Sequence, residues 1–249
     1  MKRLWAVILL FPLALYVLGL AFGTPRAEYS PSTVQNAWLN GSTVFHPDEF
    51  AYVGIAYRML LNHDWDPHYY HNPPLNIYSN FGLFWLGSAE RLPHNVSYGD
   101  REIAPFSLYV MARYLSALYT LLTVALSYTA GRVAFQRRAG WITAGIVALS
   151  PLTVQHAHYA TPNAETTMLS AAAIVMSLLI FRDRFSRRRS IWAGYLFAGL
   201  LVGLAMSARY NAAVVGLVVG LALVNAWWRH RRRWLVVGMA FIMMPIGFA

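Results

Sequence analysis

Residues 163–189 read NAETTMLSAAAIVMSLLIFRDRFSRRR, an apolar run up to Phe181 that is followed by a cluster of arginines. A helix rises 1.5 Å per residue, so an apolar run of this length suits a hydrocarbon core of about 30 Å. The pattern of an apolar run with a basic end recurs along the chain. It predicts an all-α polytopic membrane protein of about seven transmembrane helices, over residues 4–22, 105–130, 140–154, 163–181, 191–206, 212–228 and 234–249.

The composition excludes an ordinary water-soluble domain. Hydrophobic residues make up 57% of the 249-residue chain and charged residues only 12%, whereas a soluble domain carries roughly a quarter charged residues. Cysteine is absent, which excludes disulfide bonds, thiolate metal sites and a cysteine nucleophile. The apolar run at 4–22 is longer than the hydrophobic part of a signal peptide, so we interpret it as a retained anchor.

The positions of the charges predict the orientation. The basic ends of the runs hold 14 of the 20 lysines and arginines, and only Asp183 among the ten acids falls on their side. By the positive-inside rule the N-terminus is cytoplasmic and the loop 24–104 is extracytoplasmic, in a bacterial or archaeal plasma membrane or in the ER. The clusters are short and lie at span ends without a binding motif, so we expect no nucleic-acid partner.

The large outer loop contains predicted interfacial helices. His46-Pro47-Asp48-Glu49 is typical of a helix start, with proline early and two acids in the first turn. A helix over 47–61 would turn one apolar stripe toward the membrane or the bundle. The stripe consists of Phe50, Val53, Tyr57 and Leu60. The apolar stretch 75–87 is too short to span and predicts an interfacial or re-entrant helix. The two acids have an alternative role as simple helix caps.

The rest of the loop is rich in polar and aromatic residues that suit a polyol substrate. Imidazole and carboxylate groups also suit a divalent metal, and the candidates are His46, His63, Asp64, Asp66, His68 and His71. Their spacing is not that of a compact metal site, so a solvated polar loop is the favoured interpretation and a divalent metal the alternative.

A second set of polar residues is predicted on the same side. His156 and His158, between the third and fourth spans, suit phosphate or hydroxyl groups. Arg113 and Arg209 lie near the outer ends of spans, against the positive-inside preference. Each arginine either binds an anionic lipid phosphate, or snorkels or pairs with an acid.

Several ordered segments resemble the polytopic glycosyltransferases of the GT-C class, most closely family 39, the protein O-mannosyltransferase and aminoarabinose transferase relatives. The segments are His46-Pro47-Asp48-Glu49, Asn72-Pro73-Pro74-Leu75, residues 113–118, residues 150–163 and residues 203–211. His-Pro-Asp-Glu is also similar to mannosyltransferases of family 22. Asn163 and Asn72 stand where relatives often carry Asp and Lys. The resemblance implies one GT-C-like transmembrane domain over 1–249, shorter than the usual family member and incomplete at its C-terminus.

The resemblance implies transfer of a sugar from a polyprenyl or dolichyl phosphate to a hydroxyl of a protein, lipid or glycan, with no metal or other cofactor required. Asp48 would be the base and Glu49 would orient it. Donor phosphate would be bound by Arg113, His158, Arg209 and Tyr210. The substrate would contact His46, Tyr52, Arg58, His156 and Asn163. Two alternatives stay open: a lipid-linked transporter, and a non-catalytic subunit of a larger membrane complex.

Overall fold

The computed structural model describes residues 2–21, 46–69, 71–89, 97–98, 101–102, 104–185, 187–230 and 233–248. Its helices are α1 (Lys2–Val17), α3 (Pro47–Asn62), α4 (Leu75–Leu86), α5 (Phe106–Ala134), α6 (Arg137–Leu149), α7 (Pro151–Ala157), α8 (Pro162–Phe181), α9 (Arg188–Ala208), the 3-10 turn η2 (Tyr210–Ala212), α10 (Ala213–Arg229) and α11 (Trp234–Phe248). Two short antiparallel strands, β1 (Ser97–Tyr98) and β2 (Arg101–Glu102), are also present.

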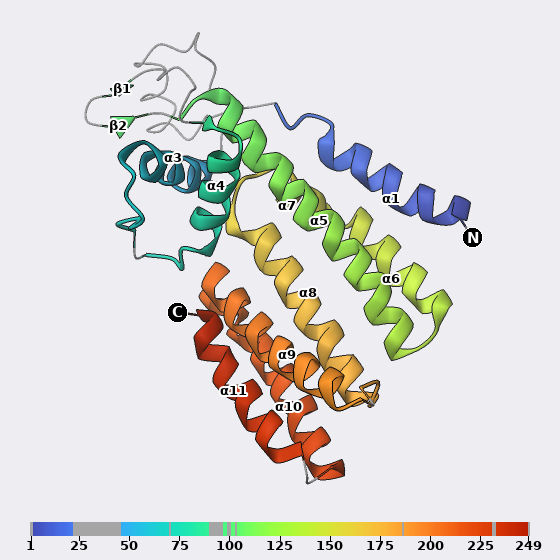
Figure 1. The fold of residues 1–249 in the computed structure, drawn as a ribbon. Coiled ribbons are helices and arrows are strands. Elements are labelled where there is room, and N and C mark those ends of the chain that lie inside the picture. The colour runs from blue at the N-terminus through green and yellow to red at the C-terminus, as the bar shows by residue number, and fades with distance from the viewer. Residues whose placement is uncertain are drawn as a thin grey trace.

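The long helices form one bundle with a small helical cap at one end (Figure 1). α5 packs against α1, α6 and α8, and α8 in turn packs against α9 and α10. α11 packs along α9. α3 and α4 pack against each other and form the cap near the start of α5. The predicted outer helix at 47–61 is confirmed as α3, and the short helix predicted at 75–87 is α4.

The all-α membrane architecture is confirmed. Four helices of the described chain are long and apolar enough to cross a bilayer, at Ser107–Ala134, Pro162–Phe181, Arg189–Ala208 and Tyr210–Arg229. The other three predicted spans correspond to α1, α6 and α11, which have 16, 13 and 15 residues. The count of seven spans therefore stays a prediction.

The predicted third span, 140–154, is wrong as a single helix. α6 ends at Leu149, and α7 begins at Pro151. The intervening Ser150 has an extended backbone, with φ −62° and ψ 126°. The ring of a proline disfavours helical geometry in the residue before it, which explains the break.

The basic ends of several helices meet at the end of the bundle opposite the cap. The Asp183 carboxylate, after α8, accepts a hydrogen bond of 2.7 Å from Arg233 and lies 2.9 Å from the ring of His230. Hydrogen bonding from Arg233 is the main cause that lowers the pKa of Asp183. Arg182 also donates to the carbonyl of Ala134 at the end of α5. These contacts bring together three segments that the charge pattern predicted on one side of the membrane.

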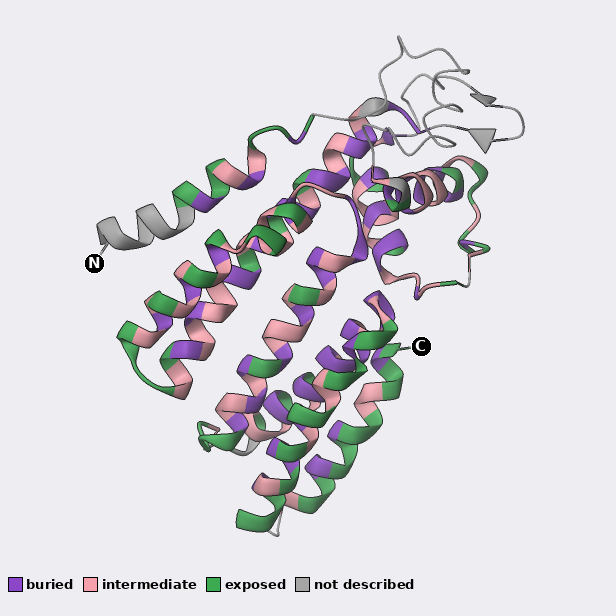
Figure 2. Ribbon diagram, turned by 180° about the vertical axis from the view of Figure 1, so that it is seen from behind, coloured by how far each residue is buried: buried purple, intermediate pink, exposed green. Residues whose placement is uncertain are grey.

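Buried residues line the inner faces of the helices, and the outward faces are exposed (Figure 2). On α10 the exposed side chains before the terminal Arg229 are apolar: Leu217 is 69% exposed, Leu221 73% and Trp228 70%. Apolar surface of this extent suits contact with lipid rather than water.

α9 and α11 approach closely because glycine faces the contact. Gly199 and Gly203 form a G-x-x-x-G pair on α9, a spacing that lets membrane helices pack backbone to backbone. A β-carbon at Gly199 would lie 1.9 Å from the carbonyl oxygen of Ala240, and one at Gly203 would lie 2.2 Å from that of Met244. Side chains at either position would force the helices apart.

We expect Gly199→Ala to lower the thermal midpoint of the protein in detergent. The added methyl group must displace backbone rather than a flexible side chain, and overpacking of this kind costs about 1–3 kcal/mol. Gly238→Ala on α11 is the matched control, because a β-carbon there meets nothing within 4 Å. Fluorescence-detected size-exclusion chromatography after heating measures both variants, and equal midpoints would contradict the proposed close contact.

Candidate functional site

The start of α3 turns two neighbouring acids in different directions. His46 caps the helix, and its Nδ1 accepts a hydrogen bond of 3.4 Å from the backbone N–H of Asp48. Successive helical residues point about 100° apart. The Asp48 side chain is 59% exposed, whereas that of Glu49 is fully buried. One carboxylate therefore faces outward and the other faces the bundle.

Glu49 forms a bidentate ion pair with Arg113 of α5. Arg113 donates from Nε to Glu49 Oε1 at 2.8 Å and from Nη2 to Oε2 at 2.6 Å. Arg113 Nη1 donates to the carbonyl of Leu20 at 2.8 Å, and the Ala160 N–H donates to Glu49 Oε1 at 2.6 Å. The sequence left open whether Arg113 binds a lipid phosphate, or snorkels or pairs with an acid. In the structure Arg113 pairs with an acid. The pair joins α3 and α5 to the residues after α1 and before α8.

His158 lies in the same junction. Its Nδ1 is 2.7 Å from the carbonyl oxygen of Val154, and its Nε2 is 2.9 Å from that of Leu18. Both ring nitrogens therefore have backbone partners, and the ring connects α7 to the residues that follow α1.

Several other predicted residues are linked to one another. Arg209 follows α9, and its guanidinium donates to Asn163 Oδ1 on α8. Burial lowers the pKa of His156, and the charges of Arg209 and His46 lower it further. His46 Nδ1 is 3.9 Å from Asp48 Oδ2. We call these five residues, His46, Asp48, His156, Asn163 and Arg209, the outer cluster.

The lowered pKa of His156 has a consequence for the charge of the outer cluster. The imidazole is neutral near pH 7, because an ordinary histidine pKa already lies near 6.5. Arg209 is charged at every physiological pH. The outer cluster therefore combines an exposed carboxylate with a fixed guanidinium.

Tyr52, one turn after Asp48 on α3, connects the outer cluster to a neighbouring pocket. Burial raises the pKa of Tyr52 to about 12, Tyr69 and Asp48 also raise it, and Arg209 lowers it. The ring of Tyr52 packs edge-on against Tyr69, with 6.2 Å between centroids. Asn72 donates a hydrogen bond of 3.3 Å to the Tyr69 hydroxyl.

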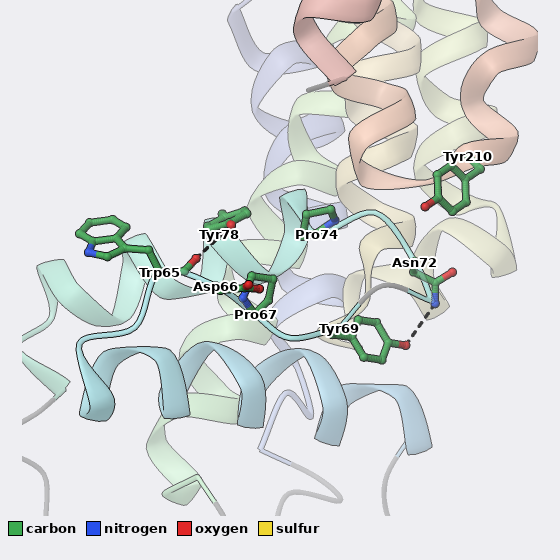
Figure 3. Close-up of a pocket in the computed structure, with 8 residues that line it drawn as sticks. All are labelled: Trp65, Asp66, Pro67, Tyr69, Asn72, Pro74, Tyr78 and Tyr210. Carbon is green, nitrogen blue, oxygen red and sulfur yellow. Dashed lines mark hydrogen bonds between the residues drawn. The ribbon is translucent and has the colours of Figure 1, made fainter.

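The pocket has a volume of about 520 Å³ and is lined mainly by rings (Figure 3). Tyr210 contributes from η2, at the far side from the connection between α3 and α4. The remaining walls come from that connection and the start of α4, and their aromatic members are Trp65, Tyr69 and Tyr78. The sequence pointed to this loop as dense in aromatic and turn residues, but it did not identify these three rings as site residues.

Arg58, a predicted substrate ligand, supports the pocket from outside its lining. Its Nη2 donates a hydrogen bond of 2.6 Å to the carbonyl of Pro67. Tyr78 of α4 donates one of 3.0 Å to the carbonyl of Trp65. Both bonds hold the extended chain between α3 and α4 in place.

α4 is attached to the bundle by polar contacts that the sequence analysis did not predict. Glu165 of α8 is 3% exposed. It accepts hydrogen bonds from Asn76 at 2.9 Å and from Ser79 at 2.6 Å. These contacts fix the helix that carries one wall of the pocket.

The described residues contain no group of three or more histidines and acids that could hold a metal ion. His68 instead forms a local contact, with Nε2 2.9 Å from Asp64 Oδ2. Its backbone N–H donates to Asp66 at 2.8 Å. These bonds shape the loop between α3 and α4.

We expect Arg113→Met and Glu49→Leu, made singly, to lower the folded fraction severely. Each leaves an uncompensated buried charge, which costs about 3–5 kcal/mol. The double variant should recover much of the loss, because replacing both partners removes the unpaired charge. The thermal midpoint of each of the three variants is measured in detergent. Single variants as stable as the parent, or a double variant worse than both, would contradict this role.

Comparison with known proteins gives one family. The model of the dolichyl-phosphate-mannose-protein mannosyltransferase family matches residues 106–247, more than half of the chain, from α5 into α11. No curated protein and no solved structure gives a significant match. The matched region includes Arg209 and Asn163 of the outer cluster but not Asp48. The chain belongs to the dolichyl-phosphate-mannose-protein mannosyltransferase family.

Proposed function

We propose that this protein is a membrane glycosyltransferase that moves a sugar from a polyprenyl or dolichyl phosphate to a hydroxyl acceptor on the extracytoplasmic side. The observation that carries the proposal is the outer cluster, in which exposed Asp48 lies 3.9 Å from His46 and the guanidinium of Arg209 donates to Asn163. Family membership supports the reaction class. The reaction needs a base and a stabilised anionic leaving group, and the outer cluster contains one group suited to each.

Asp48 is the proposed base. It removes the proton from the acceptor hydroxyl as that oxygen bonds to the anomeric carbon. The bond between that carbon and the phosphate oxygen breaks at the same time, so the configuration inverts. The bonding electron pair leaves with the phosphate. A carboxylate that is largely exposed is accessible to an incoming hydroxyl.

Arg209 is the proposed ligand of the departing lipid phosphate. A guanidinium binds phosphate oxygens with paired hydrogen bonds, and this stabilises the charge that develops on the leaving group. Tyr210 follows it directly in the chain, and its hydroxyl suits the same phosphate. His46, His156 and Asn163 complete the polar surroundings. No divalent metal is needed in this scheme, because Arg209 supplies the positive charge.

Glu49, Arg113 and His158 have structural roles in this proposal. The Glu49–Arg113 pair holds the first turn of α3 and so positions Asp48. His158 joins α7 to the residues after α1. Of the four phosphate ligands that the sequence suggested, this proposal keeps Arg209 and Tyr210 in that role.

The orientation follows from the charge pattern. The basic loops at the end opposite the cap are proposed to be cytoplasmic, which leaves α3 and α4 outside. The donor then enters laterally from the outer leaflet, and the acceptor arrives from the aqueous side.

We expect Asp48→Asn to abolish sugar transfer while the protein folds normally. Loss of a general base lowers the rate by about 10²- to 10⁴-fold. Membranes that express the parent or the variant are given radiolabelled dolichyl-phosphate mannose and other polyprenyl-phosphate sugars, and transferred label is measured. Asp64→Asn is the matched control, because asparagine keeps the oxygen that accepts the Asp66 N–H. Undiminished transfer by Asp48→Asn would exclude this base. No transfer by the folded parent would favour a non-catalytic subunit.

We expect Arg209→Gln to lower kcat by about 10²- to 10³-fold, the usual effect of removing one donor to a developing anion. Arg209→Lys should retain part of the rate, because it keeps the charge but not the paired hydrogen bonds. Arg182→Gln, at the other end of the bundle, is the control. A change in KM alone, or equal effects of Gln at both positions, would contradict stabilisation of the leaving group.

A further inference from the structure

Six exposed arginines lie at the end of the bundle opposite the cap, and the proposed reaction uses none of them. Three come from the end of α5 and the start of α6, and three from the connection between α8 and α9 and the start of α9. They are Arg132, Arg137, Arg138, Arg184, Arg187 and Arg189. We call these six residues the arginine face.

The two turns that carry the arginine face are joined to each other and lie side by side (Figures 1 and 2). Arg182, at the end of α8, donates a hydrogen bond to the carbonyl of Ala134 at the end of α5. The ring of Phe185 folds back onto α9 and packs edge-on against Tyr195, with 6.3 Å between centroids. The arginine face is therefore one continuous surface on packed helix ends.

The positive charge of the arginine face is not balanced within the protein. Asp183 is the one acid in the sequence at this end, and its carboxylate is already bound by Arg233 and His230. In the described part of the chain, no ion pair includes a member of the arginine face. Three members lie in the first turns of α6 and α9, where the helix dipole favours acids. These charges therefore do not stabilise the helices that carry them.

Exposed aromatic rings indicate that the arginine face lies at the level of the lipid headgroups. Trp228, near the end of α10, and Trp234, at the start of α11, are both exposed at this end of the bundle. Tryptophan is enriched where a membrane meets water. Phe135, between the arginines of the first turn, is 81% exposed. A ring this exposed beside cations suits the boundary between headgroups and acyl chains.

We propose that the arginine face binds anionic phospholipids of the cytoplasmic leaflet, with their phosphates on the guanidinium groups of both turns. A guanidinium binds phosphate oxygens with paired hydrogen bonds. Clusters of four to eight basic residues on the cytoplasmic side of membrane helices attract anionic lipids. The bound lipids hold the α5–α6 turn and the α8–α9 turn together. The inference goes beyond the proposed sugar transfer, whose reacting groups lie at the other end, and uses the orientation proposed above.

The test measures lipid binding by the full chain in detergent. The protein is titrated with dioleoylphosphatidylglycerol and, separately, with dioleoylphosphatidylcholine, and bound lipid is counted by native mass spectrometry. The parent should bind the anionic lipid at least about tenfold more tightly. The triple variant Arg137→Gln/Arg138→Gln/Arg184→Gln should lose at least about tenfold in affinity for phosphatidylglycerol and keep its affinity for phosphatidylcholine. Its thermal midpoint without lipid should equal that of the parent, because the three side chains are exposed and form no ion pair in the described structure.

Two matched controls separate the arginine face from charge in general. Lysine at the same three positions keeps the charge but not the paired hydrogen bonds, so it should retain most of the preference for phosphatidylglycerol. Arg26→Gln/Arg91→Gln/Arg101→Gln removes the same number of arginines from the loop 24–104. This second triple variant should bind both lipids as the parent does.

Three results would overturn the proposal. Equal affinity of the parent for the two lipids would leave the arginine face to an acidic segment of a protein partner. Equal loss of phosphatidylglycerol binding in both glutamine variants would mean that net charge alone attracts the lipid. Complete competition by soluble glycerol phosphate would mean a site for a free anion. None of these measurements depends on sugar transfer, so failure of the proposed function would leave them unaltered.

Discussion

The buried ion pair between Glu49 and Arg113 is the contact on which the outer part of the structure depends. Two charges withdrawn from water require each other and further hydrogen bonds, and here Leu20 and Ala160 supply these. Four segments distant in sequence therefore meet at one point. The neighbouring position, Asp48, is held at the surface because Glu49 cannot leave the interior. The buried Glu49–Arg113 pair thus determines where the exposed carboxylate of Asp48 lies.

Local patterns in the sequence were sufficient to predict most helices. α3 was predicted because proline and acids at residues 47–49 form a favourable first turn, and α8 because an unbroken apolar run ends in arginines. The break between α6 and α7 was missed although Pro151 signals it, since apolar character continues across Ser150. Hydropathy also predicted spans at α1, α6 and α11, but these helices are shorter than the predicted spans.

The site was less predictable because its contacts join residues far apart in the chain. Arg113 is 64 positions from Glu49, and no periodic pattern indicates which acid it meets. Arg209 and Asn163 were identified from unusual placement and family resemblance, but their contact depends on how α8 and α9 pack. The rings of Trp65 and Tyr78 belong to an irregular segment, where neither a helical nor a strand period indicates which side chains converge.

The walls of the ring-lined pocket come from two parts of the chain that are far apart in sequence. Tyr210 belongs to the tightly interlocked α9, α10 and α11, while the other walls belong to the connection between α3 and α4 and to α4 itself. The cavity keeps its shape only while these parts keep their separation. A molecule that touches both walls therefore contacts both parts of the chain, and its fit depends on the distance between them.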